Sequence, residues 1–110
     1  MRRPELDRIL AAMLETHSGI SDLLFCVDRP FQVEAFGELK TADIEPKLSK
    51  LTRFQTERIA LNIIGNDRRL LRELVERGAC DCSYALSDKS RFRVNIFRQR
   101  GNCAIVMACK

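Results

Sequence analysis

Apolar and polar positions follow one another along this chain with two different periods. In residues 5–17 the apolar side chains recur at helical spacing. The same spacing returns between Thr52 and Gly65, and again between Asp67 and Gly78. In both cases a residue suited to capping precedes the apolar positions and a glycine follows them. The pattern therefore predicts three helices.

Strand patterns occupy most of what lies between these helices. Residues 91–96 alternate strictly between polar and apolar side chains, as a strand with one buried face does, and Phe97 completes the predicted strand. Strands are expected at 21–27, 31–36, 39–40, 80–86, 91–97 and 103–107, with a hairpin turn at 99–102. The order predicts a single α+β domain, in which a helix, two or three strands, a helical pair and a three-stranded antiparallel meander pack together.

The apolar residues on these elements form the expected core. The third helix is expected to bury a stripe made of Leu70, Leu71, Leu74 and Val75. The strand at 80–86 is expected to turn Cys80, Cys82 and Tyr84 to one face. Four aromatic side chains at alternating positions are expected in the core, not on a surface that stacks bases: Phe31, Phe36, Phe92 and Phe97.

The strand at 91–97 carries the most informative chemistry. Alternation places Phe92, Val94 and Ile96 on one face, and Arg91, Arg93 and Asn95 on the other. Two neighbouring cations repel each other unless negative charge lies across from them, and Arg98 and Arg100 extend the positive charge into the turn. The arginines form either a clamp for a phosphate or acidic partner, or a solvated outer face. Spacing alone favours the solvated face, because exposed charge is the default.

Length and composition exclude several classes of protein. The chain has 110 residues, 45% hydrophobic and 31% charged, which suits one soluble globular domain. No apolar stretch approaches the roughly 18 residues that cross a bilayer, so no direct membrane insertion is expected. The basic N-terminus leads into an amphipathic segment and not into an apolar signal core, which argues against secretion. Cations concentrate in the second half, mostly as arginine, which indicates an anionic partner. The net charge of +4 is too weak to indicate nucleic acid.

Residues suited to catalysis or metal binding are sparse. Five cysteines, an odd number, lie mostly in apolar runs and are expected to be reduced thiols that fill the core: Cys26, Cys80, Cys82, Cys103 and Cys109. The only histidine, His17, has no partner that would complete a metal site. The phosphate-binding sequence Gly-x-x-x-x-Gly-Lys-[Ser/Thr] does not occur, so no catalytic residue and no cofactor are expected in this chain.

Four segments together carry a family resemblance. They are Gly-Ile-Ser-Asp-Leu at 19–23, Phe-Gly-Glu-Leu at 36–39, Asp-Cys-Ser-Tyr at 81–84, and the arginine strand at 91–97 followed by Gln-Arg-Gly at 99–101. In this order and spacing they resemble the N-terminal domain of the PilT/PilU-type twitching-motility ATPases. These motors retract type IV pili and belong to the secretion ATPase superfamily. The arginine strand with Gln-Arg-Gly is the most specific part.

The resemblance implies that residues 1–110 form a PAS-like N-terminal domain. In the family this domain precedes a RecA-like ATPase domain, which is absent here, and the chain ends where the family's linker would begin. Six family chains form a ring that binds ATP and magnesium. Each N-terminal domain packs on the ATPase domain of the same or the adjacent subunit. Hydrolysis drives pilus disassembly at the base of the pilus machinery, so the implied location is the cytoplasmic face of the inner membrane.

The resemblance also implies a role for arginines. In the family, N-terminal-domain arginines reach the nucleotide phosphates at the cleft between the two domains. Arg93 matches such an arginine best, with Arg91, Arg98 and Arg100 as nearby candidates. An arginine there would stabilise charge on the phosphates, as an arginine finger does. Two positions depart from the family pattern: Ala108 stands where members often carry a second arginine, and Leu24 where they carry a histidine.

Two other functions remain open from the sequence. A stand-alone PAS-like sensor would have an internal pocket, although few polar residues interrupt the apolar runs to orient a ligand. A small RNA-binding domain would use the basic second half of the chain. Against it, the strand aromatics are expected to alternate away from the arginines instead of sharing their face.

Overall fold

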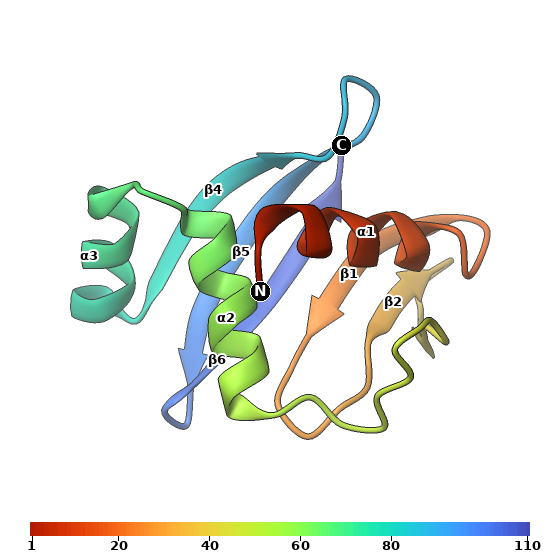
Figure 1. Cartoon of the computed structure of the whole chain (residues 1–110), viewed down its shortest axis with the longest axis horizontal. Helices are drawn as coiled ribbons and strands as arrows, with labels where there is room; N and C mark the ends of the chain where they lie inside the picture. The colour runs from red at the N-terminus through yellow and green to blue at the C-terminus, as the bar shows by residue number, and fades with distance from the viewer.

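The six strands form one antiparallel sheet, and the helices lie against it (Figure 1). A computed structural model describes residues 1–110. The elements are α1 (Arg3–Leu14), β1 (Ile20–Phe25), β2 (Gln32–Ala35), β3 (Glu38–Thr41), α2 (Arg53–Ile64), α3 (Arg68–Arg77), β4 (Ala79–Ala85), β5 (Arg91–Gln99) and β6 (Asn102–Cys109). The strand order is β3-β2-β1-β6-β5-β4. The predicted α+β class is confirmed, and the arrangement is consistent with a PAS-like domain.

The last strand of the chain lies in the middle of the sheet. β6 pairs with β5 on one side and with β1 on the other, which places Leu23 opposite Met107 and Phe25 opposite Ile105. All four of these side chains are fully buried. Their packing joins two groups of strands that the sequence pattern predicts separately. The join itself depends on residues far apart in the chain, which local periodicity does not reveal.

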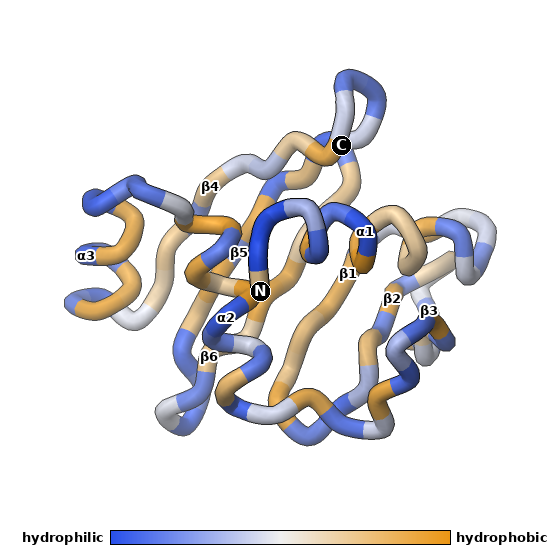
Figure 2. Tube along the Cα trace, viewed as in Figure 1, coloured by the Kyte–Doolittle hydropathy of each residue, from blue (hydrophilic) through white to orange (hydrophobic).

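Helices α1 and α2 cover one face of the sheet (Figure 1). Side chains on that face, such as Val94 and Ile96, pack against Leu6, Leu10 and Ile59 of the helices, and all five are at most 1% exposed. Figure 2 shows hydrophobic segments along the central strands and hydrophilic ones along the loops and turns. We call the other side of the sheet, which no helix covers, the open face.

The predicted helix ends are confirmed for α2 and α3. Thr52 and Gln55 form a reciprocal capping box: the Gln55 backbone N–H donates to Thr52 Oγ1 at 3.1 Å, and the Thr52 N–H donates to Gln55 Oε1 at 2.8 Å. Asp67 accepts bonds from two backbone N–H groups at the start of α3. Gly78 ends α3 in the left-handed conformation, at φ 78°. These contacts satisfy backbone groups that a helix leaves unpaired at its ends.

Two helix predictions differ from the structure. The first helix ends at Leu14, not at residue 17, because the N–H groups of Glu15 and Thr16 bond to carbonyls three residues back and close a turn. In α3, Leu70 and Leu74 are buried as predicted, but Leu71 is 41% and Val75 62% exposed. The helix rests on the sheet through one narrow stripe against β4, and its outer side stays open to solvent.

The aromatic prediction is correct for Phe31 and Phe92 and wrong for the other two residues. Phe36 lies in the β2–β3 turn at φ 52° and is 78% exposed. Phe97 is half-buried on the open face, because strand alternation places it with Arg93 and not with Phe92. No helix is long and apolar enough to span a bilayer.

Candidate functional site

Arg91 and Arg93 lie on the open face, as the alternation of β5 predicts. Their neighbours Phe92 and Val94 are buried beneath the helices, so the backbone turns both arginines the other way. Both arginines are exposed. β5 pairs with β4 from Arg91 to Phe97 and with β6 from Phe92 to Gln99. The two cations are therefore held on a strand with a rigid backbone.

A third cation joins them at this end of the face. The Lys110 backbone N–H donates to the Arg91 carbonyl at 3.0 Å, and Lys110 Nζ donates to Ser83 Oγ at 3.4 Å. Ser83 lies directly opposite Arg93 on β4. We call Arg91, Arg93 and Lys110 the cationic patch. Sequence reasoning missed Lys110 because it lies beyond the last predicted strand.

The cationic patch forms no ion pair within the chain, and Asp81, diagonal to Arg93 on β4, accepts a hydrogen bond from Asn95. The three ion pairs of the structure lie elsewhere: Lys40–Glu38, Lys47–Asp43 and Arg69–Glu73. On β6, Ala108 lies opposite Arg93, and Asp22 lies opposite Ala108 on the next strand. Asp22 is thus one strand too far to pair with Arg93. The patch leaves positive charge free for an external anion.

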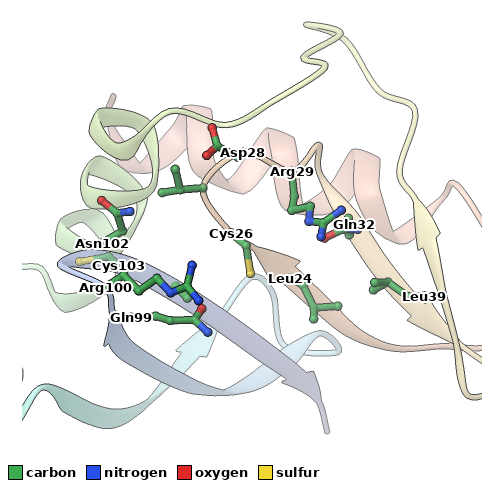
Figure 3. A pocket seen from close by; sticks show the side chains of 12 residues that line it. Leu24, Cys26, Asp28, Arg29, Gln32, Leu39, Gln99, Arg100, Asn102 and Cys103 are labelled. Atoms are coloured by element: carbon green, nitrogen blue, oxygen red, sulfur yellow. The ribbon is translucent and has the colours of Figure 1, made fainter.

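The other two predicted arginines do not belong to this patch. Arg98 follows Ile96 on the side of the sheet that carries the helices. Arg100 lies in the β5–β6 turn at φ 55°, next to Gly101 at φ 81°, so the predicted hairpin turn is confirmed. At about 3.3 Å per residue, this turn is roughly 20 Å from Arg93. Across a hollow in the open face, Arg100 faces the side of the sheet that carries Arg29 (Figure 3).

A buried tyrosine fastens α1 to the sheet next to the patch. Tyr84 donates a hydrogen bond from its hydroxyl to Asp7 Oδ1, and the Arg3 guanidinium lies 4.4 Å from the centre of its ring. Burial, with the bond to Asp7, raises the pKa of Tyr84 well above its usual value, so the hydroxyl stays protonated. Tyr84 lies opposite Phe92, and this contact supports the segment of β5 that bears Arg91 and Arg93.

The five cysteines are free, but only Cys80 is fully buried, and Cys109 is exposed, contrary to the core-filling prediction. Burial raises the pKa of all five thiols. The pKa of Cys80 rises to about 11, first through burial and then through Cys82 and nearby carboxylates. Protonated thiols are poor nucleophiles and metal ligands, so this geometry does not favour chemistry at sulfur.

These raised pKa values predict a loss of stability at alkaline pH. The Cys80 thiol stays protonated in the folded chain up to about pH 11, but in the unfolded chain it ionises above about pH 9. Ionisation of the unfolded chain favours unfolding. The free energy of unfolding is therefore unaffected by this thiol below about pH 9 and falls as the pH rises toward 11. Under reducing conditions, the melting temperature is expected to fall less between about pH 7 and about pH 10 in Cys80→Ala than in the wild type. Cys109→Ala, at an exposed site, is the control; equal losses in wild type and Cys80→Ala would contradict the prediction.

Comparison of sequences alone finds no relative: no protein-family model and no curated protein matches the chain. Comparison of structures finds several. The crystal structure of the pilus retraction motor PilT with bound ADP matches 98% of this chain at a TM-score of 0.74 and 27% identity. Two DotB ATPases match 99% of it at a TM-score of 0.73, from Legionella pneumophila at 18% identity and from Yersinia pseudotuberculosis at 20%.

This chain corresponds to less than a third of each of these ATPases. The chain spans 29% of the PilT and Legionella DotB chains and 30% of the Yersinia DotB chain. The DotB matches establish a common fold. The PilT match has higher identity and covers nearly every residue of this chain. The resemblance to the N-terminal domain of PilT-type ATPases is therefore confirmed at the level of structure.

Proposed function

We propose that this chain is the non-catalytic N-terminal domain of a hexameric type IV pilus retraction ATPase. In this proposal it packs on the RecA-like ATPase domain of the same or an adjacent subunit, at the cytoplasmic face of the inner membrane and the base of the pilus machinery. Its role is to close the nucleotide cleft and to present cations to the phosphates of ATP. The match to a pilus retraction motor with bound ADP supports the family context.

The cationic patch is the observation that carries the proposal. Arg91 and Arg93 are exposed, lie on a strand held in the sheet by its neighbours, and form no ion pair within the chain. Because the backbone under them is already ordered, only side-chain freedom is lost when these arginines meet a phosphate oxygen. Arg93 is the proposed phosphate contact, and Arg91 assists it. The P-loop that cradles the nucleotide, and the ligands for magnesium, would come from the ATPase domain.

Neither alternative function gains support from the geometry. An RNA platform needs two or three aromatic side chains beside its cations, and Phe97 is the one aromatic residue among the open-face positions of the sheet. A PAS-like sensor would hold its ligand between the sheet and the helices. The large hollow described above lies instead on the open face.

The coding sequence that follows Lys110 tests the proposal directly. We expect a P-loop sequence in that region, and we expect the protein made from the whole reading frame to hydrolyse ATP. Native mass spectrometry should find six copies in the assembled particle. A frame that continues into an unrelated domain, or a longer protein that does not bind ATP, would rule out the proposed function.

A further inference from the structure

A hollow of about 820 Å³ lies at the hairpin end of the open face, away from the cationic patch (Figure 3). Its floor is formed by apolar side chains of β1 and β6, among them Leu24 and Ala104, and by Cys26 just after β1. Arg29 and Arg100 line it from opposite sides. Figure 3 shows Arg100 extending from the hairpin, and Arg29 beside Gln32 on the other side. Neither guanidinium forms an ion pair within the chain.

The backbone holds both arginines in place. On one side, the Asp28 N–H donates to the Leu51 carbonyl at 2.8 Å, and the Leu51 N–H donates to the Arg29 carbonyl at 2.8 Å. On the other side, Arg100 sits in a two-residue turn whose flanking residues, Gln99 and Asn102, are paired. Both positions are therefore fixed before any ligand arrives, which lowers the entropic cost of binding.

From this hollow we infer that the domain binds an acidic, partly apolar segment of a partner polypeptide. The charge of Arg29 and Arg100 fits carboxylates at the two sides of the hollow, and the apolar floor fits an aliphatic side chain between them. Leu39, 59% exposed at the edge of the hollow, widens this apolar surface. A free phosphate would leave the apolar floor unused, so a polypeptide is the better match.

One acidic residue opposes such a ligand. Asp28 lines the hollow and forms no ion pair with either arginine; Figure 3 shows its carboxylate at the rim, turned away from Arg29. It adopts φ 67°, a conformation that asparagine also tolerates. Asp28→Asn therefore removes repulsion toward an acidic segment without straining the backbone.

The test measures binding of a fluorescent peptide of alternating glutamate and leucine to the full chain by anisotropy at low salt. Arg29→Glu and Arg100→Glu are each expected to weaken the affinity about tenfold or more, because each loses a charge-assisted contact and adds repulsion. Asp28→Asn is expected to tighten it. Circular dichroism checks that each variant is folded. Arg72→Glu reverses an exposed charge on α3, outside the open face and the cationic patch, and is the matched control, with unchanged affinity.

Several outcomes would overturn the inference. These are the absence of peptide binding, equal binding of a lysine–leucine peptide, or an affinity that Arg29→Glu and Arg100→Glu leave unchanged. Saturable binding of inorganic phosphate at these two arginines, without binding of the acidic peptide, would overturn the choice of a polypeptide. The inference is independent of the proposed nucleotide contact, because no residue of the cationic patch lines the hollow.

Discussion

Arg93→Ala in the longer protein is expected to lower ATP turnover by about two orders of magnitude or more, while the domain keeps its fold. Arginines that contact the transferring phosphate contribute roughly 10³- to 10⁵-fold to the rate in related phosphoryl-transfer enzymes. We expect a smaller loss here because Arg91 lies on the same face and compensates in part. Steady-state ATP hydrolysis at saturating magnesium measures the effect.

Arg98→Ala is the matched control for this experiment. It removes the same type of side chain from the same strand, but on the side that carries the helices. Both arginines are exposed and free of ion pairs, so both variants should melt within a few degrees of the wild type. Equal turnover in Arg93→Ala and wild type would remove Arg93 from the nucleotide site. Equal losses in the two variants would assign the effect to general charge.

Phe25→Ala is expected to lower the free energy of unfolding of the chain by about 3–5 kcal/mol. Phe25 is fully buried where β1 meets β6, opposite Ile105. Its ring also packs edge-on against Phe31, with the ring centres 6.0 Å apart and the planes at 84°. The substitution leaves a cavity at the join between the two strand groups. A domain of this size has only about 5–15 kcal/mol of stability, so the loss should be plain in urea unfolding.

Phe54→Ala provides the same substitution at an exposed position. The Phe54 ring is 65% exposed on α2 and has the Arg58 guanidinium 5.1 Å from its centre. Its loss is expected to cost at most about 1 kcal/mol. If Phe25→Ala and Phe54→Ala unfolded at the same urea concentration, the packing of Phe25 between β1 and β6 would not stabilise the domain as expected.

The sequence predicts the features of this fold that depend on neighbouring residues. The Thr52 cap, the Asp67 cap and the Gly78 stop are local signals, and each is found in the structure as expected. The alternation that places Arg93 and Phe92 on opposite faces of β5 is equally local, because side chains of a strand have a period of two. The candidate phosphate contact was therefore predictable in orientation, although its role stays a prediction.

Features that depend on distant residues were not predictable in the same way. The exposure of Leu71 and Val75 follows from how little of α3 the sheet covers, which helical periodicity does not report. The meeting of Arg29 and Arg100 across one hollow results from the pairing of β1 with β6. The residues around Arg29 carry no local signal that connects it to the hairpin. Such a signal exists only in three dimensions.

The central position of β6 also has a consequence for how this domain is made in the cell. A ribosome delivers β6 after every other strand, so until residues 102–109 emerge, the nascent chain has two incomplete half-sheets with unpaired edges at β1 and β5. Such edges invite association with other nascent chains. A polypeptide that continues past Lys110 would let β6 leave the exit tunnel and insert while translation is still under way.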